Sequence, residues 1–217
     1  MREAGHPVPE GAARVLSYPA MSNQSPRRSV VDFYLDTACP WSWRTSVWIR
    51  EVAKVRPVDV HWKFFSLEEV NKPTGGVRDG HIASRRTFRT MVLVRRRHGE
   101  EGVDRLYEVF GRTRHEEKRD LDEATVRGCL EQAGLAPGLL DEALADPSTE
   151  EEYLAEHREV AAKGCFGVAS LVIDGSAPVF GPVVVPVPTG EEAGELWDHV
   201  KALSTRRDFF ELKRPRR

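Results

Sequence analysis

The stretch DTACPWSWRT, residues 36–45, contains the residue types of a thiol redox site. Cys39 is followed by Pro40, Trp41 and Ser42, and Ser42 stands where a two-thiol site has its second cysteine. A serine hydroxyl donates a hydrogen bond to a thiolate, but it neither forms nor attacks a disulfide. An attacked Cys39 therefore has to be released by an outside thiol or by another cysteine of the chain. The spacing predicts a monothiol site with Cys39 as nucleophile and Ser42 as its hydrogen-bond donor.

The elements expected around Cys39 favour its ionisation. Residues 29–36, SVVDFYLD, form a mostly apolar run typical of a buried strand, and Pro40 suits the first position of a helix. A cysteine at the start of a helix faces backbone N–H groups without helical partners and the positive end of the helix dipole. We therefore expect its pKa to fall from about 8.5 to a value roughly between 3.5 and 7.5. The alternative is an ordinary buried thiol at a helix start, which leaves the Cys-Pro-aromatic-Ser order unexplained.

The two other cysteines are widely separated from Cys39 and from each other. Three cysteines at such spacing fit neither a disulfide framework nor a zinc site, so we expect reduced thiols. Cys129 lies in a helical pattern and is expected in the core. Cys165 lies just before a strand that should face Cys39, so it is either a buried core residue, the favoured interpretation, or a resolving thiol.

The composition limits the classes of partner. The 217 residues contain 32 basic and 34 acidic side chains, a balance that argues against a general nucleic-acid or membrane-surface binder. No apolar run is long enough for a signal-peptide core or a membrane span. We therefore expect a cytoplasmic protein with a small-molecule substrate, no nucleic acid and no membrane partner, and the sequence leaves a homodimer open.

The periodicity of apolar residues predicts the order of elements. A helix is expected from Pro40 to just before Pro57, followed by a strand at residues 58–65 whose alternation suits a half-exposed edge and parallel pairing with the first strand. Helical patterns follow at residues 81–99, 103–114, 122–134, 137–145 and 148–164. Two short strands around Asp174-Gly175 predict a hairpin. A last helix is expected at residues 189–204, and both this helix and the one at residue 148 start with capping-box spacing.

The order β-α-β, helices, β-β-α predicts an α/β protein with a thioredoxin fold and an all-helical insertion, as in the DsbA group. We divide the chain into a disordered tail (1–28), the first half of the thioredoxin fold (29–78), the insertion (79–164), the second half (165–209) and a basic tail (210–217). On the first insertion helix, His81, Arg85 and Arg89 share one face. We expect a solvated face there, with an anion or thiol-cofactor site as the alternative.

Several stretches together resemble a known family. They are DFYLDTACPWSWRTSVWIREV, SLEEVN, VFGRTRHEEKRD, VFGPVVVPVPTGEEAGELWD and FFELKR. Over most of residues 30–213 the chain resembles the DsbA-like proteins of mycothiol-using bacteria, the group named for mycothiol-dependent nitroreductase. The resemblance implies an oxidoreductase with mycothiol or another low-molecular-weight thiol as co-substrate, and neither a metal nor a nucleotide.

The resemblance also implies which residues surround the thiol. Pro40 and Trp41 belong to the motif itself, and matching positions suggest Asn71 and His115 as further pocket residues. For Trp41 the alternative is packing, although a tryptophan between Cys39 and Ser42 has little core to enter. For Asn71 the alternative is a turn residue, and for His115 it is a cap on helix carbonyls.

The sequence departs from the family pattern at a second position besides Ser42. Thioredoxin-fold proteins place a cis-proline in the loop opposite the cysteine, and the resemblance puts Ala169 there, after Val168. A cis bond before a residue other than proline costs about 3 to 4 kcal/mol, so we expect the Val168–Ala169 bond to be trans. Val168 and Ala169 are nevertheless expected to contact the substrate or thiol.

Three functions remain open at this point. The first is a monothiol oxidoreductase in which Cys39 attacks a disulfide or an electrophilic small molecule and an external thiol regenerates it. The second is a thiol-cofactor-dependent transferase or isomerase, resembling kappa-class glutathione transferases or chromene-carboxylate isomerases and acting on a specialised metabolite. The third is a degenerate scaffold that binds a partner and catalyses nothing.

Overall fold

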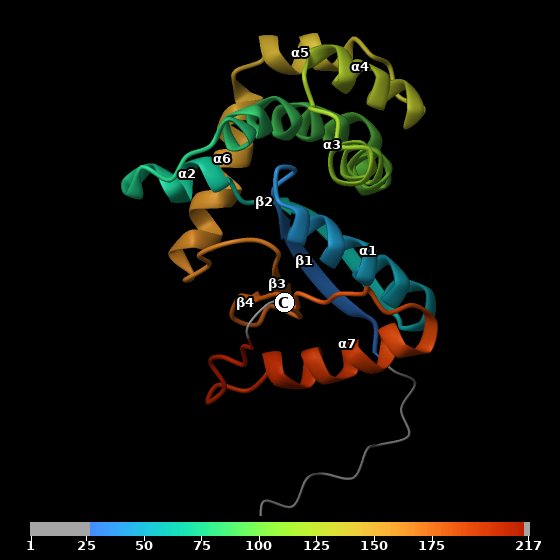
Figure 1. Cartoon of the computed structure of the whole chain (residues 1–217), viewed down its shortest axis with the longest axis vertical. Coiled ribbons are helices and arrows are strands. Elements are labelled where there is room, and N and C mark those ends of the chain that lie inside the picture. The colour runs from blue at the N-terminus through green and yellow to red at the C-terminus, as the bar shows by residue number, and fades with distance from the viewer. Residues whose placement is uncertain (1–26, 215–217) are drawn as a thin grey trace, which may run out of the picture.

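A computed structural model of the chain describes residues 27–214 (Figure 1). The predicted disordered tail, 1–28, lies outside the described residues except for Arg27 and Arg28. The elements are, in order, β1 (Ser29–Leu35), α1 (Pro40–Val55), β2 (Val58–Phe64), α2 (Leu67–Asn71), η1 (Lys72–Thr74), α3 (Asp79–Gly111), η2 (Arg112–Glu116), α4 (Glu123–Gln132), α5 (Leu139–Ala145), α6 (Ser148–Ala162), β3 (Ser170–Ile173), β4 (Val179–Phe180) and α7 (Gly190–Ser204).

The strands form one mixed sheet in the order β2-β1-β3-β4. β1 pairs in parallel with β2 over its whole length, from Ser29 opposite Val58 to Leu35 opposite Phe64, and antiparallel with β3. The parallel pairing and the edge position of β2 confirm the predictions for residues 58–65. The predicted hairpin joins β3 to β4, and its turn residues Asp174 and Gly175 both have positive φ, 50° and 75°.

Helices α1 and α7 pack against each other beside the sheet (Figure 1). Trp48 of α1 is fully buried against Trp197 of α7, and its Nε1 donates a hydrogen bond to the carbonyl of Ala193 at 3.3 Å. This contact fixes α1, the helix that starts at Cys39, to the second half of the thioredoxin fold.

The two helices predicted at residues 81–99 and 103–114 are joined into α3, which bends at Gly99. Gly99 has φ 66° and ψ −169°, a conformation that only glycine adopts readily. The helix therefore bends at this residue and continues beyond it. After Gly111 the chain continues into a short π-helix, η2, which contains His115.

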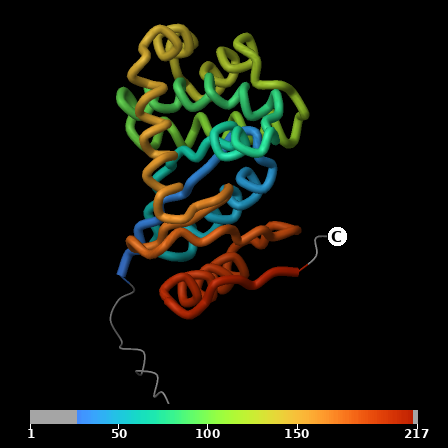
Figure 2. The backbone as a smooth tube through the Cα atoms, turned by 90° about the vertical axis from the view of Figure 1, so that its left-hand side faces the viewer, coloured from blue at the N-terminus to red at the C-terminus, as the bar shows by residue number. Residues whose placement is uncertain are grey.

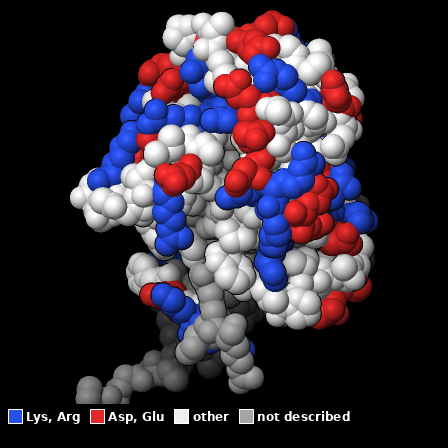
Figure 3. Space-filling model, turned by 45° about the horizontal axis from the view of Figure 1, so that its top comes forward, with Lys and Arg blue, Asp and Glu red and all other residues white. Residues whose placement is uncertain are grey.

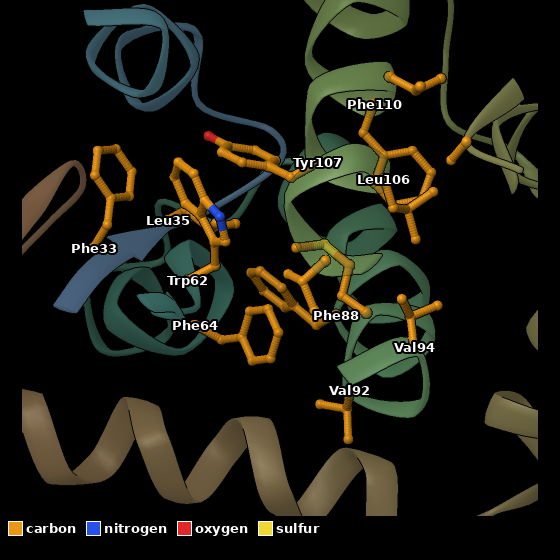
Figure 4. Packing of buried hydrophobic residues seen from close by; sticks show 14 of the residues in the cluster. Phe33, Leu35, Trp62, Phe64, Phe88, Val92, Val94, Leu106, Tyr107 and Phe110 are labelled. Atoms are coloured by element: carbon orange, nitrogen blue, oxygen red, sulfur yellow. The ribbon is translucent and has the colours of Figure 1, made fainter. Parts of the chain in front are cut away.

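The sheet and the insertion share one hydrophobic core (Figure 4). Trp62 of β2 lies edge-on to Tyr107 of α3 with ring centroids 5.3 Å apart, and Phe64 packs on Phe88 at 5.4 Å. Figure 2 shows the helices of the insertion above the sheet, with α6 descending from them to the level of the strands. The division of the chain at residues 78/79 and 164/165 stays a prediction.

The two predicted capping boxes do not form. Thr189 is the N-cap of α7 but makes no side-chain capping bond. Ser148 is the first residue of α6, and the N-cap is Pro147. The backbone N and the Oγ of Ser148 both donate hydrogen bonds to Asp146, so the Ser148 side chain does not cap the helix. Within residues 27–214, no helix combines the length and apolar character needed to cross a bilayer.

Candidate active site

Cys39 is the N-cap residue of α1 and directs its sulfur at the start of that helix. The backbone N–H of Ser42 donates to Sγ at 3.4 Å, and Sγ lies 3.7 Å from the carbonyl oxygen of Val168 on the facing loop. The side chain is mostly enclosed, with 9% of its residue surface exposed. The placement agrees with the sequence argument: the sulfur contacts an amide that has no partner within the helix.

Ser42 is completely buried, and its hydroxyl lies 3.1 Å from the hydroxyl of Tyr107 on α3. Burial raises the pKa of Tyr107, so its hydroxyl is neutral and able to donate. The sequence places Tyr107 on an apolar helix face, where a phenol requires a buried hydrogen-bond partner. That requirement was the available indication of a site contact, but the sequence does not say which residue the partner is.

Asp36, three residues before Cys39, is a fully buried carboxylate that organises the loop. One oxygen accepts from the backbone N of Ala38 at 2.8 Å and from the hydroxyl of Ser84 at 2.6 Å; the other accepts from the backbone N of Leu67 at 2.8 Å. Burial raises its pKa to about 6, although these hydrogen bonds favour the charged form. Sequence analysis missed this residue, which ties the Cys39 loop to both α2 and α3.

His115 contacts the same loop from the insertion. Its Nε2 lies 2.9 Å from the carbonyl oxygen of Thr37, two residues before Cys39. Burial lowers the pKa of His115 to about 4, so the ring is neutral at pH 7 and Nε2–H donates to the carbonyl. The structure therefore brings His115 to the site as a support of the loop.

Trp41 is half-buried and packs against a small apolar group around the sulfur, the Cys39 cluster. The buried members of this cluster are Tyr34, Cys39, Phe65, Val160, Cys165, Val168 and Val172. The guanidinium of Arg44 lies over the Trp41 ring at 5.6 Å, and Pro40 is exposed. Pro40 and Trp41 thus lie next to the thiol, and their contact with a substrate or thiol stays a prediction.

Asn71 lies at the end of α2, where its side-chain amide donates to the carbonyl of Leu67 at 2.7 Å. This is the contact of a turn residue, and a pocket role for Asn71 stays a prediction. The row His81, Arg85 and Arg89 is not a simple solvated face: Arg85 pairs with the buried Glu68, and Arg89 donates to the carbonyls of Ala143 and Leu144. These arginines hold helices together.

The loop that faces Cys39 corrects one prediction: the Val168–Ala169 peptide bond is cis, not trans. Ala169 is completely buried, and its carbonyl accepts from the backbone N of Gly181 at 2.8 Å. The preceding carbonyl, that of Val168, is turned to the sulfur of Cys39. Burial and these two contacts fix the orientation of the peptide in place of a proline ring.

The other two thiols occupy different surroundings, and all three cysteines are free. Cys165 belongs to the Cys39 cluster and donates to the carbonyl of Gly167 at 3.3 Å, and burial raises its pKa. Cys129 is buried in the main core beside Thr113. The structure therefore brings Cys165, but not Cys129, near Cys39; a resolving role for Cys165 stays a prediction.

Residues 27–214 contain no group of three or more His, Cys, Asp or Glu side chains suited to hold a metal ion.

Comparison with known sequences gives a family. Residues 38–214 match the family described as Rv2466c-like, mycothiol-dependent nitroreductase Rv2466c. A protein of Mycobacterium tuberculosis described as uncharacterized, Rv2286c, is 36% identical over 194 residues, which cover 87% of this chain and 83% of that protein.

Comparison with solved structures gives the fold. The probable DsbA oxidoreductase SCO1869 from Streptomyces coelicolor superposes with a TM-score of 0.58 at 19% identity, over 87% of this chain and 94% of that chain. The cytosolic disulfide reductase DsbM from Pseudomonas aeruginosa, solved with GSH, gives a TM-score of 0.58 at 12% identity, over 80% of this chain and all of that one. The predicted α/β fold of the DsbA type is confirmed.

Proposed function

Since the chain belongs to the Rv2466c-like family of mycothiol-dependent nitroreductases, we propose that it is a member in which Cys39 alone carries the thiol exchange. Membership makes it a thiol-dependent oxidoreductase with a low-molecular-weight thiol as co-substrate. The observation that carries the single-thiol route is local: Cys39 caps α1 with its sulfur on the Ser42 amide, and the position of a second thiol holds a buried serine.

The exchange needs only the sulfur of Cys39 and an external thiol. The Cys39 thiolate attacks one sulfur of a substrate disulfide, forms a mixed disulfide and releases the other half as a thiolate. A first mycothiol thiolate attacks the Cys39 sulfur and displaces the bound half. A second releases mycothiol disulfide and restores Cys39, so that two thiols are oxidised for each disulfide reduced. The Ser42 amide and the start of α1 stabilise the sulfur anion at each stage.

The remaining site residues support this chemistry from around the sulfur. Trp41 offers an aromatic surface to a substrate, and Val168 lies on the facing loop with its carbonyl toward the sulfur. His115 and Ser42 hold the loop and the helix start in place. We place the protein in the cytoplasm, because three free buried thiols suit a reducing compartment.

Intact-mass analysis tests the proposal. The chain is incubated with mycothiol disulfide or glutathione disulfide, and peptide mapping locates any adduct. We expect one mycothiol adduct on Cys39 and none on a Cys39→Ser variant, with Cys129→Ser as a control that keeps the adduct. An unmodified chain, or an adduct on another cysteine, would refute the proposal.

A thiol-cofactor-dependent transferase or isomerase is the second candidate, favoured because position 42 holds serine in place of a second motif cysteine and position 169 holds alanine in place of proline. In that reaction a bound thiol does the addition, so the Cys39→Ser variant keeps much of its turnover. Under the proposed function the same variant loses turnover by several orders of magnitude. Steady-state rates of the two proteins distinguish the candidates.

A further inference from the structure

We propose that Tyr107 is a positioning residue of the thiol site: its hydroxyl donates to Ser42 Oγ and so leaves the hydrogen of Ser42 to point at the sulfur of Cys39. The two hydroxyl oxygens are 3.1 Å apart, and both residues are buried. The insertion thereby acts on the reactivity of a thiol at the start of α1. This inference rests on the proposed function, because it takes Cys39 as the reacting group.

The side chains of Cys39 and Ser42 lie on the same face of α1. Cys39 is the N-cap and Ser42 is the third residue of the helix, the spacing of a capping box, in which the third side chain reaches back to the cap residue. One half of that arrangement is present, since the backbone N of Ser42 donates to Sγ at 3.4 Å. The Ser42 hydroxyl supplies a second donor when Cys39 is ionised.

The neighbours of Tyr107 favour donation from the phenol to Ser42. Only one of the two hydroxyls donates in the bond that joins them, and a phenol is more acidic than an aliphatic hydroxyl and hence the stronger donor. Ser46 also lies beside the phenol, but it already donates to the carbonyl of Trp43 at 2.7 Å and accepts from Arg50 at 2.9 Å. Donation to Ser42 therefore satisfies the phenol without competing with the bonds of Ser46.

The surroundings of Tyr107 hold its ring in place and keep its hydroxyl neutral. Trp62 and Trp43 lie edge-on to the ring, with centroids 5.3 Å and 6.2 Å away, and Figure 4 shows Trp62 beside it. Burial raises the pKa of Tyr107, and the negative charge of Cys39 adds to this rise. The effect of Cys39 places the phenol within electrostatic reach of the sulfur. The hydroxyl is therefore a fixed donor next to Ser42.

The test follows the rate at which iodoacetamide alkylates Cys39 in the full chain across a range of pH, with peptide mapping to exclude the other two thiols. Iodoacetamide reacts with the thiolate, so the midpoint of this profile reports the ionisation of Cys39. We expect Ser42→Ala to move the midpoint upward by about one pH unit, because it removes one hydrogen bond to a charged group. Tyr107→Phe is expected to move it upward by about half as much, because Ser42 keeps its hydrogen but loses the partner that orients it.

Other ionisable groups around the helix start are the same in every variant. They are Tyr34 of β1, Asp36 of the loop, Arg50 of α1, His115 of η2 and Cys165 before β3. Their titration contributes equally to each profile, so a difference between two profiles comes from the substituted hydroxyls.

The double variant separates an action through Ser42 from a direct one. When Ser42 is already alanine, Tyr107→Phe is expected to leave the midpoint unchanged. Tyr153→Phe is the matched control: Tyr153 of α6 is equally buried and packs on Phe88 in the same core, so its loss of a hydroxyl should not move the midpoint.

Three results would overturn the inference. A downward shift in Tyr107→Phe would mean that Ser42 donates to the phenol and is released toward the sulfur by the substitution. Equal shifts with and without Ser42 would make Tyr107 a packing residue. An unchanged midpoint in Ser42→Ala would refute the inference without any variant of Tyr107, so the test does not depend on how well Tyr107→Phe folds. The proposed function is judged separately by the mycothiol adduct, which can fail to form while these profiles behave as expected.

Discussion

Ser42 occupies the position at which one oxygen replaces the second sulfur of a dithiol site. Its backbone N is 3.4 Å from the Cys39 sulfur, so a sulfur at its β-carbon would lie within a helical turn of Cys39. We predict that Ser42→Cys forms an internal disulfide when it is treated with glutathione disulfide, seen as the loss of two hydrogens in the intact mass and a fall from four titratable thiols to two, those of Cys129 and Cys165. Ser46→Cys, equally buried but one turn further along α1, is the control and should keep its thiols. A Ser42→Cys chain that keeps all four of its thiols after oxidation would show that the helix start holds the pair too far apart.

Asp36 predicts a pH dependence of stability. Its folded pKa of about 6 lies above the unfolded value of about 3.9, so the stability it contributes is complete below about pH 4 and is lost as the pH rises through 6. The loss amounts to about 3 kcal/mol at pH 7. Asp36→Asn cannot ionise, so its free energy of unfolding should lack this component.

The measurement is urea unfolding of both proteins between pH 4 and 7.5. The difference between the parent chain and Asp36→Asn is expected to shift against the parent as the pH rises. Asparagine also presents an NH₂ group where Leu67 N–H needs an acceptor, which lowers the stability of the variant at every pH. A difference that stays constant over this range would contradict the raised pKa.

Among the elements, α3 contacts α1 at Gly111. A Cβ at this position would overlap the ring of Trp43, which is buried and donates its Nε1–H to Glu116 at 3.1 Å. We predict that Gly111→Ala lowers the free energy of unfolding by about 1 to 3 kcal/mol, because the indole has to move within a packed core. Chemical denaturation measures the change.

Gly128 on α4 is the matched control for that substitution. It is also inside a helix, but a Cβ there meets no atom within 4 Å. Gly128→Ala is expected to stabilise the protein by about 0.5 to 1 kcal/mol, the usual gain from replacing glycine within a helix. Equal effects at the two glycines would mean that the Trp43 contact is not what requires Gly111.

The elements near Cys39 were predictable because local periodicity decides them. The alternation of residues 58–65 and the apolar run before Cys39 each specified a strand, and Pro40 marked the first residue of α1.

The union of two predicted helices at Gly99 was not predictable, since an isolated glycine is typical of a helix end as well as of a bend. The site contacts of Tyr107 and Asp36 were not predicted, because local sequence patterns do not reveal partners that are distant in the chain. The partner of Tyr107 is 65 residues away, and those of Asp36 are up to 48 residues away. The Val168–Ala169 bond was wrongly predicted to be trans. That prediction considered only the intrinsic free-energy cost of a cis bond before a residue other than proline, without the tertiary contacts of the loop.

At the scale of the whole molecule, one core joins the thioredoxin half to the insertion (Figure 4). The insertion contains none of the five tryptophans, which are Trp41, Trp43, Trp48, Trp62 and Trp197. It does contain a large share of the residues in helices. We predict one cooperative transition, with tryptophan fluorescence and far-UV circular dichroism giving the same urea midpoint. Separate midpoints would mean that the insertion unfolds independently despite the shared core.

The surface of the insertion agrees with the balanced composition. In the face seen in Figure 3, Lys and Arg side chains are interspersed with Asp and Glu. Arg96 pairs with both Asp146 and Glu152, and Arg97 pairs with Glu142, so the helices present matched charges. The sequence predicted the balance but not these pairings, which depend on how α3, α5 and α6 come together.

The contact between the Cys39 sulfur and the carbonyl of Val168 joins residues 129 positions apart. A ribosome must therefore make the entire helical insertion before the facing wall of the site exists. During that interval the sulfur lacks its contact with Val168. The support that Tyr107 and His115 give to the loop and the helix start is also incomplete. The nascent polypeptide thus carries an accessible thiol, and its final chemistry is acquired only late in translation.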